Sequence, residues 1–363
     1  MKILLVSPLK STAGSVVRFW NIALQLQKKG HTVVYVERRA NTMAPQFSDP
    51  NIRYYSSRTY SNLYIDLFMS ALYNLIVLMR HCNCSVYYAL KPAPNNGIPA
   101  LIAKCMGKRI LLDIDDLDYG YFGKGMRRTM SYFFFRHLPR FFCYVTCHTR
   151  KLSDYIVNEL HVPKNRVYFL AQGVSPEFAA FDYAHQQRIP RSIVYVATLG
   201  ITSDFGDIVP ALEAVCTAYP DTVISVVGDG VRRSAFERQV AASTAIKHCT
   251  FYGLIPHTEL AAFMARHEVG VNYMRKSFVN DCRAVLKLRE YLACGLQVVC
   301  NDAGDSDIFA GYIHICSSID ELGERITAVF ADGYSLNTRG HDYVCSSLSW
   351  ETIVDGLIPL LSD

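Results

Sequence analysis

The sequence has few charged residues and no extreme net charge. Charged side chains make up 19% of its 363 residues, and the formal net charge is +5 at pH 7. This modest total gives no support to nucleic-acid binding. Paired CxxC spacing is also absent, so the twelve scattered cysteines predict no zinc site and are expected to be reduced core thiols, as in cytosolic proteins.

An uninterrupted apolar run of membrane-spanning length is missing as well. The N-terminal MKILLVSPLK is too short for a signal peptide and is expected to be a strand. Polar residues such as Asp66 and Asn74 interrupt the longest apolar stretch, Leu63 to Met79, which predicts a buried or interfacial helix and no transmembrane segment. We therefore expect a cytoplasmic protein, with a peripheral position at the inner face of the plasma membrane as a further option.

The full G-x-G-x-x-G fingerprint is a third absence. Residues 2–8 predict a strand, 11–15 a loop that contains Gly14, 17–29 a helix and 31–37 a second strand. This is a βαβ unit of the doubly wound type. Without the fingerprint, a tightly gripped dinucleotide is not expected in it.

The chain does contain enough apolar residues for two domains. Half of its residues are hydrophobic, and 363 residues exceed what one compact core usually holds. Strands and helices alternate in both halves, which predicts an α/β fold of two Rossmann-like doubly wound domains. We expect domains at 1–178 and 192–345, a linker at 179–191, and a C-terminal helix at 346–363.

The stretch RAVLKLREYLACGLQVVCNDAG, which begins at Arg283, is the most informative one. As a helix from Ala284 to Cys294, it places Arg283, Lys287 and Glu290 on one face and apolar residues opposite. Gly295 is the expected C′ residue. Basic residues above helix amides predict a diphosphate site, and the carboxylate can accept hydrogen bonds from sugar hydroxyls. An amphipathic helix with ordinary surface charges is the alternative.

The segment Lys287-Leu-Arg-Glu290-Tyr-Leu-Ala-Cys-Gly295 resembles the nucleotide-binding motif of family 4 glycosyltransferases, enzymes of the two-domain GT-B fold. The resemblance implies that Glu290 holds the ribose of the donor nucleotide. It also implies that the two domains face each other across a cleft and that the C-terminal helix at 346–363 returns toward the first domain. Where many members carry a glutamate that touches the donor sugar, this chain has Cys282, which makes the neighbouring Asp281 a candidate catalytic residue. With the glycine turns that also resemble the family, the expected donor-binding residues are Gly200, Gly228, Tyr252, Gly253, Arg283, Lys287 and Glu290.

Four carboxylates, Asp113, Asp115, Asp116 and Asp118, lie at the end of the predicted strand 109–114. They repel one another, so such a cluster is costly at the carboxyl end of a strand unless it has a function there. The resemblance implies an acceptor-side role, for which Asp115 or Asp116 is the candidate. A divalent metal site and a solvated turn are the alternatives, and because GT-B enzymes generally need no metal, none is expected.

The loop after the first predicted strand is a second acceptor-side candidate. In GT-B enzymes the equivalent loop faces the cleft, which implies the same for Ala13, Gly14 and Ser15. A plain tight turn is the alternative.

The region 122–151 combines seven basic residues with aromatic clusters and has no acidic residue. This mixture is typical of a surface that lies on anionic lipid. Core aromatics with solvated arginines are one alternative, and nucleic acid is a weaker one because no nucleic-acid motif accompanies the region. The residues expected at the membrane surface are Arg127, Arg128, Arg136 and Arg140.

Together these features predict a hexosyltransferase that moves a sugar from a UDP- or GDP-linked donor to a glycan or lipid-linked acceptor. The resemblance implies retention of configuration and a role in cell-surface polysaccharide or glycolipid biosynthesis. The nucleotide sugar is a substrate, and no separate cofactor is expected. A nucleotide-sugar 2-epimerase of the same fold and a non-catalytic partner subunit of a glycosyltransferase are the rival hypotheses.

Overall fold

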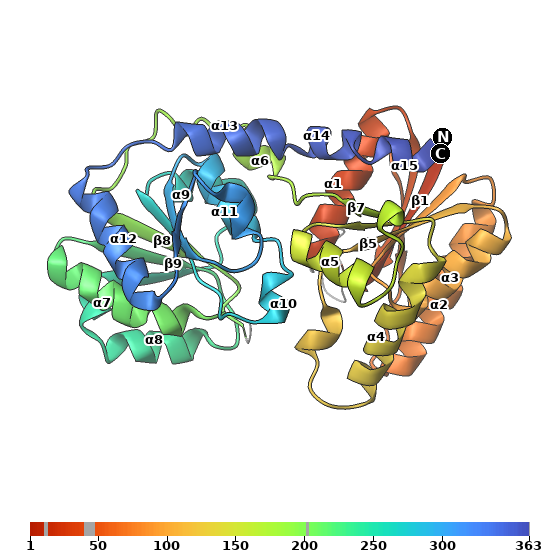
Figure 1. Cartoon of the computed structure of the whole chain (residues 1–363), viewed down its shortest axis with the longest axis horizontal. Coiled ribbons are helices and arrows are strands. Elements are labelled where there is room, and N and C mark those ends of the chain that lie inside the picture. Colours follow the sequence, from red (N-terminus) through yellow and green to blue (C-terminus); the bar gives the residue numbers. More distant parts are fainter. Residues whose placement is uncertain (11–13, 40–47, 201–202, 363) are drawn as a thin grey trace. The chain divides into compact units, whose positions relative to one another are not determined.

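A computed structural model describes residues 1–10, 14–39, 48–200 and 203–362. The chain forms two compact α/β units (Figure 1). The first unit contains Met1–Gln172, Cys282–Ala284 and Trp350–Asp363, and the second contains Gly173–Asp281 and Val285–Ser349. The predicted α/β fold with two doubly wound sheets is confirmed.

The first unit is built on a parallel sheet of seven strands in the described part of the chain, in the order β3-β2-β1-β4-β5-β6-β7. The central strands are apolar on both faces because helices cover both faces of the sheet. In chain order the strands are β1 (Lys2–Lys10), β2 (Thr32–Arg38), β3 (Arg53–Ser57), β4 (Val86–Leu90), β5 (Arg109–Ile114), β6 (Tyr144–Cys147) and β7 (Val167–Phe169).

The side chains of neighbouring residues in a strand point to opposite faces of this sheet. Tyr87 packs into the core formed with α2 to α5, whereas the ring of Tyr88 lies 5.2 Å from that of Phe19 in α1. Helices α2, α3 and α4 lie side by side in Figure 1. The helices of the unit are α1 (Gly14–Lys28), α2 (Leu63–Arg80), α3 (Pro94–Cys105), α4 (Met126–His137), α5 (Arg150–Asn158), α14 (Trp350–Asp355) and α15 (Ile358–Ser362).

The second unit repeats the plan with six described strands in the order β10-β9-β8-β11-β12-β13. Helices α7, α8 and α12 pack on one face, where Tyr195 and Phe205 lie in the core (Figure 1). On the other face Tyr291 fills the space above Gly270, where a Cβ would come within 2.4 Å of its ring. The elements are α6 (Pro176–Ala179), β8 (Ser192–Val196), α7 (Val209–Ala218), β9 (Val223–Val227), α8 (Arg233–Ala241), β10 (Cys249–Gly253), α9 (His257–Met264), β11 (Val269–Asn272), α10 (Phe278–Asp281), α11 (Leu286–Ala293), β12 (Gln297–Asn301), β13 (His314–Cys316), α12 (Ile319–Ala331) and α13 (Thr338–Ser347).

The unit boundaries differ from the expected domain boundaries. Residues 173–191, expected to close the first domain and form the linker, cluster with the second unit. The expected C-terminal helix is two short helices, α14 and α15, interrupted at Gly356 and belonging to the first unit. The sequence contains a breaker there, since glycine and the following Pro359 both weaken a continuous helix.

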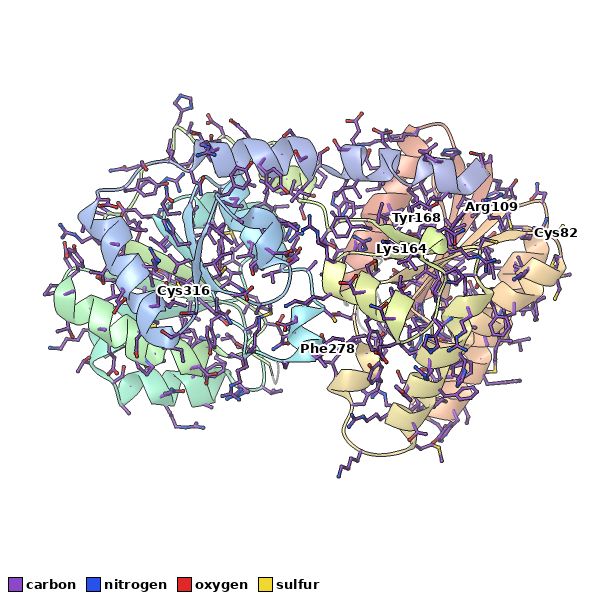
Figure 2. The ribbon with its side chains drawn as sticks, viewed as in Figure 1. Cys82, Arg109, Lys164, Tyr168, Phe278 and Cys316 are labelled. Carbon is purple, nitrogen blue, oxygen red and sulfur yellow. The ribbon has the colours of Figure 1, made fainter. Side chains whose placement is uncertain are left out.

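All twelve cysteines are free thiols. Cys316 lies inside the second unit, and Cys82 lies at the surface of the first (Figure 2). Cys105 is the other exposed thiol, and the remaining ones are buried or half-buried. The expectation of core thiols therefore holds for most of them.

Candidate active site

The strand order of the first sheet reverses between β1 and β4, and ligand sites of doubly wound sheets lie at this point, beyond the carboxyl ends of the strands. The residues that follow the four neighbouring strands here are polar. Ser15 follows β1, Lys91 follows β4, Asp115 and Asp116 follow β5, and His148 follows β6.

A buried lysine neutralises the predicted acid cluster. The Nζ atom of Lys91 lies 2.9 Å from Oδ1 of Asp115, 2.7 Å from Oδ1 of Asp118 and 4.0 Å from Oδ2 of Asp116. Burial alone would lower the pKa of Lys91, but these carboxylates raise it well above its usual value. Its backbone has φ 63°, a conformation that costs a non-glycine residue free energy and marks a constrained position.

The fourth carboxylate of the cluster has its own cation. Asp113 is buried, and the guanidinium of Arg18 in α1 donates to both of its oxygens at 2.9 and 3.1 Å. Among the described residues, no group of three or more His, Cys, Asp and Glu side chains is placed to hold a metal ion. Lys91 and Arg18 provide the positive charge that offsets the repulsion predicted among the four carboxylates.

Asp115 is held as an anion. Burial would raise its pKa, but Lys91 and His148 lower it, and the Ser15 hydroxyl donates a hydrogen bond that lowers it further. The structure thus brings together Ser15 and Asp115, two candidates that are 100 residues apart in the sequence. Gly14 opens helix α1 beside them, and Ala13 lies outside the described residues.

The pKa of Asp116 shifts in the opposite direction to that of Asp115. Its side chain is 25% exposed, and the Tyr121 hydroxyl donates to its Oδ1 at 3.1 Å. Burial, together with repulsion from Asp115 and Asp118, raises the pKa of Asp116 to about 7 against the opposing effect of Lys91. A carboxyl group with this pKa can take up a proton near neutral pH.

Arg283 belongs to this first site and not to the predicted donor helix. The helix begins at Leu286, because the segment Cys282–Ala284 packs with the first unit. Cys282 is fully buried there, and the guanidinium of Arg283 lies 6.0 Å from the centre of the Tyr121 ring. The predicted arc of Arg283, Lys287 and Glu290 on one helix is therefore wrong for Arg283.

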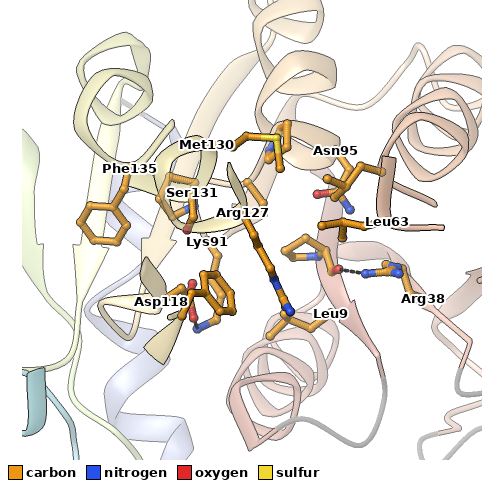
Figure 3. A pocket seen from close by; sticks show the side chains of 16 residues that line it. Leu9, Arg38, Leu63, Lys91, Asn95, Asp118, Arg127, Met130, Ser131 and Phe135 are labelled. Atoms are coloured by element: carbon orange, nitrogen blue, oxygen red, sulfur yellow. Dashed lines mark hydrogen bonds and ion pairs between the residues drawn. The ribbon is translucent and has the colours of Figure 1, made fainter. Parts of the chain in front are cut away.

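A pocket of about 150 Å³ opens beside the acid cluster (Figure 3). Leu63 and Leu67 of α2 and Met130 of α4 contribute apolar walls. The ion pair of Lys91 and Asp118 forms its polar end. The other lining residues are Pro8, Leu9, Arg38, Pro92, Ala93, Pro94, Asn95, Phe122, Arg127, Ser131 and Phe135.

In the second sheet the strand order reverses between β8 and β11, and glycine turns lie beyond the strands on one side of this point. A Cβ on Gly228 would come within 1.8 Å of the Ala197 carbonyl oxygen, and one on Gly230 within 2.6 Å of the Leu199 carbonyl carbon. Both glycines have positive φ. The Gly228–Gly230 turn therefore packs backbone to backbone against the segment that ends at Gly200.

The predicted pair Tyr252 and Gly253 lies at the end of β10, next to this turn. The amide of Gly228 donates to the carbonyl of Gly253 at 2.7 Å. Tyr252 is about half exposed, and its ring lies 4.8 Å from that of Phe263. The structure thus brings together the four predicted donor residues Gly200, Gly228, Tyr252 and Gly253 along one edge of the sheet.

Helix α11 carries a buried carboxylate between two cations. Glu290 is 0% exposed, and its Oε2 pairs with Lys287 one turn earlier. Its Oε1 has no hydrogen bond and lies 3.7 Å from Nε2 of His257, the first residue of α9. Burial would raise the pKa of Glu290, but Lys287 and His257 lower it, and the interaction with Glu290 raises the pKa of His257.

The burial of Glu290 corrects the expected arrangement, in which this face of the helix presents its charges to solvent. Lys287 and the half-exposed His257 cover the carboxylate. The predicted end of the helix is confirmed, since Gly295 has φ 71° and its amide donates to Leu292 O.

Comparison with known proteins now adds to this geometry. Residues 190–332 match the family model described as glycosyl transferases group 1. The whole fold is similar to a glycosyltransferase from Rickettsia africae, with a TM-score of 0.77 at 12% identity, covering 99% of this chain and 97% of that one. The chain is a glycosyltransferase with the GT-B fold. No curated protein matches it by sequence.

Two further solved structures share the fold of this glycosyltransferase. HepE from Anabaena, solved in complex with UDP, has a TM-score of 0.73 at 13% identity, with 100% of both chains covered. WaaG, a glycosyltransferase involved in lipopolysaccharide biosynthesis, has a TM-score of 0.71 at 15% identity, covering 97% of this chain and 98% of that one.

A buried ion pair, which the sequence analysis did not predict, anchors the start of α11 in the glycosyltransferase. The guanidinium of Arg289 pairs with Oδ2 of Asp305, and Oδ1 of the same carboxylate accepts the amide of Val285 at 2.8 Å. The sequence analysis gives Arg289 no role. Its buried partner lies 16 residues later in the chain, so the helical pattern alone contains no sign of it.

The predicted catalytic residue Asp281 ends the short helix α10. Its Oδ1 lies 3.4 Å from Nζ of Lys276, which also pairs with Asp302. Arg275 is held by Asp207, with nitrogen to oxygen distances of 2.6 and 2.7 Å. Acidic neighbours thus balance the charges at this edge of the sheet.

The four predicted membrane arginines fall into two pairs. Arg136 and Arg140 donate to the carbonyls of Glu159 and Leu160, at 2.6 and 2.7 Å, and so satisfy backbone groups near the end of α5. Arg127 and Arg128 lie in the first turn of α4, and neither has a carboxylate within ion-pair distance among the described residues.

Proposed function

We propose that this glycosyltransferase transfers a sugar, with retention of configuration, from a nucleotide diphosphate sugar to a glycan or lipid-linked acceptor. The second unit would bind the donor nucleotide and the first unit the acceptor. The observation that carries the proposal is the Glu290 carboxylate, buried on a helix within the matched residues 190–332 and with one oxygen that lacks a hydrogen bond. Buried carboxylate oxygens are normally satisfied, so this one is suited to an incoming hydroxyl donor.

The donor site follows from the charges around this carboxylate. Ribose hydroxyls would donate to Oε1 of Glu290 once the half-exposed His257 turns aside. Lys287 and the first amides of α11 would stabilise the diphosphate, which gains negative charge as the sugar leaves. The tight turn at Gly228 and Gly230 lets the backbone approach the nucleotide closely, and Tyr252 offers a ring for the base.

The acceptor site follows from the pKa of Asp116. The acceptor hydroxyl would give its proton to the Asp116 carboxylate as its oxygen bonds to the anomeric carbon, while the bond from that carbon to the diphosphate oxygen breaks. Asp115 would remain ionised beside Lys91 and would keep that ammonium in place. Asp281 is the proposed contact to the donor sugar, in the place of the glutamate that Cys282 replaces.

We further propose that the enzyme is cytoplasmic and acts at the inner face of the plasma membrane. Its role would be in cell-surface polysaccharide or glycolipid biosynthesis. The relation in fold to WaaG supports this setting, since that protein is involved in lipopolysaccharide biosynthesis. The arginines of α4 support the membrane position.

Nucleotide binding by the Glu290→Gln variant tests the proposal. A thermal-shift screen of UDP, GDP and their common sugars should reveal a ligand that raises the melting temperature. Calorimetry should then show an affinity for that nucleotide that is lower by about 10 to 100-fold in Glu290→Gln, the loss of one charge-assisted hydrogen-bond site. The exposed Glu324→Gln is the control. Equal affinity in both variants removes the donor-site assignment, and conversion of donor without acceptor would indicate an epimerase.

A further inference from the structure

Helix α2 of the first unit has its polar face buried and its apolar face exposed. Asp66, Ser70 and Asn74, four residues apart, are its buried polar side chains. Asp66 pairs with Arg38, Ser70 accepts from the side-chain amide of Asn95, and Asn74 donates to Asn95 O at 2.8 Å. The polar residues that break the apolar run therefore attach the helix to the unit.

The opposite face of α2 is a ridge of large apolar side chains. Phe68 is 67% exposed, and its neighbours on the face follow at intervals of three and four residues. The exposed apolar residues of the helix are Tyr64, Ile65, Phe68, Leu72, Ile76 and Met79, and we call them the α2 ridge. By length and composition α2 could cross a membrane, and only 28% of it is buried. Its polar face, however, is bonded to the fold. A continuous apolar ridge of this kind marks an interaction surface.

The surface around the ridge is positively charged. Asp66 is the only acidic residue between positions 58 and 112, and it is buried. Between positions 119 and 153 the sequence has no acidic residue at all. Lys124, Arg127 and Arg128 lie at the start of α4, which also exposes Met126 and Phe133.

The pocket connects α2 and α4 with the acid cluster. Leu63 and Leu67 come from the first turns of α2, Arg127 and Met130 come from α4, and Lys91 and Asp118 form the polar end (Figure 3). The guanidinium of Arg127 lies 4.0 Å from the centre of the Phe122 ring at the pocket wall. An amphipathic molecule with an apolar chain and a polar head matches this lining.

We propose that the α2 ridge and the basic start of α4 dock on an anionic lipid bilayer, with the ridge at the depth of the acyl chains and Arg127 and Arg128 on lipid phosphates. A bilayer offers both an apolar layer and negative charge, which match the apolar ridge and the basic residues of this surface. A second copy would oppose the same surface to itself and bring like charges together. The proposal deepens the proposed function, since it makes the acceptor a membrane-resident lipid whose head enters the pocket from the bilayer.

Sedimentation with vesicles tests the docking surface. Wild-type protein should sediment with phosphatidylcholine vesicles that contain phosphatidylglycerol, and less with phosphatidylcholine alone. Phe68→Ser with Leu72→Ser should weaken binding by at least about tenfold, because two apolar side chains leave the membrane. Phe169→Ser, which changes a phenylalanine of the same unit that is 47% exposed and lies outside the ridge, should bind as the wild type does.

A second variant with its matched control tests the contribution of charge to vesicle binding. Arg127→Gln with Arg128→Gln should weaken binding to the anionic vesicles by on the order of tenfold, and added salt should reduce the difference. Arg238→Gln with Lys247→Gln removes the same charge from the second unit and should have little effect. Unchanged melting temperatures in all variants establish that each one is folded.

Three results would overturn the proposal. Wild-type protein that never sediments with anionic vesicles excludes a lipid partner. An equal loss in Phe169→Ser or in the Arg238 and Lys247 variant shows that binding is not localised. A dimer in sedimentation velocity that Phe68→Ser converts to monomer, with vesicle binding unchanged, shows that a second copy covers the ridge. If vesicles bind but no nucleotide raises the melting temperature, the proposed function fails and the docking surface stands.

Discussion

Each of the two units contains a buried ionic cluster, and the two clusters have opposite charge balances. In the first unit, Asp115, Asp116 and Asp118 share the ammonium of Lys91. In the second, the single carboxylate of Glu290 lies between Lys287 and His257. Burial and the excess of carboxylates raise the pKa of Asp116 to about 7, whereas the cations lower the pKa of Glu290 against the effect of burial.

This difference shows how one scaffold supplies two chemistries. The first cluster uses residues that follow parallel strands near a reversal of strand order, whereas the second uses residues of helices α9 and α11. In the proposed function, surplus negative charge makes the first site a proton acceptor, and surplus positive charge suits the second to a diphosphate. The count of charges, more than the fold, separates the two roles.

The largest effect is expected from removing the proton acceptor. Asp116→Asn should lower the rate of nucleotide release during sugar transfer by about 10² to 10⁴-fold, the usual contribution of a general base. Its affinity for the nucleotide, measured by calorimetry, should not change, because Glu290 is untouched. Asp154→Asn, on the surface of α5, is the control. A rate within about threefold of wild type would assign Asp116 a structural role only.

The next effect tests the cation of the first cluster. Lys91→Met should destabilise the protein by about 3–5 kcal/mol at pH 7, because the buried carboxylates lose their partner. Without Lys91 their folded pKa values rise above the unfolded ones, so the loss should shrink as the pH falls and they become protonated. Urea denaturation at pH 7 and pH 5 measures both quantities. An equal loss at the two pH values, or an equal loss in the exposed Lys28→Met, contradicts this explanation.

The glycine turn of the second unit provides a smaller test. Gly333 has a positive φ with nothing near its Cβ position, so Gly333→Ala should cost about 1 kcal/mol from backbone strain. Gly228→Ala adds a clash with Ala197 O and should cost roughly 1–3 kcal/mol more in the free energy of unfolding. Nucleotide affinity should fall in Gly228→Ala alone. Equal costs in the two variants would mean that the turn is not tightly packed.

The last test concerns how the stability of the first unit depends on pH. The pKa of Asp116 rises from its ordinary value of 3.8 to about 7 on folding, so the folded state binds more protons between these values and loses stability as the pH rises. Asp116→Asn should remove this loss. Its melting temperature should exceed that of wild type at pH 8 and should equal it near pH 4. A lower melting temperature at pH 8 would mean that Asp116 is favourably ionised.

Much of the fold could be predicted because the central strands have strong patterns. The strand Arg109–Ile114 occurs at its predicted position, and the strands predicted at 2–8 and 31–37 occur as Lys2–Lys10 and Thr32–Arg38, since continuous apolar runs predict buried parallel strands. The strand β3 and the helices α8 and α13 were not predicted. Their sequences are polar or weakly periodic, and tertiary packing determines their structure.

Only part of the candidate site could be predicted from the sequence, namely the part that follows from position at the end of a strand. The aspartates were found because they follow a strand, and the same rule applied to β4 and β6 would have selected Lys91 and His148. No local rule places Arg283 away from α11 or pairs Arg289 with Asp305, because both depend on contacts between distant parts of the chain.

The pH dependence of kcat/KM tests whether Asp116 is the proton acceptor, because it reports the ionisation of the free enzyme. With the nucleotide sugar that raises the melting temperature as donor and a membrane lipid extract as acceptor, the rate should rise with pH through a midpoint near 7, where Asp116 loses its proton. In Asp116→Asn the residual rate should show no such rise. A wild-type rate that is flat between pH 6 and pH 8, or an unchanged rise in the variant, contradicts the account.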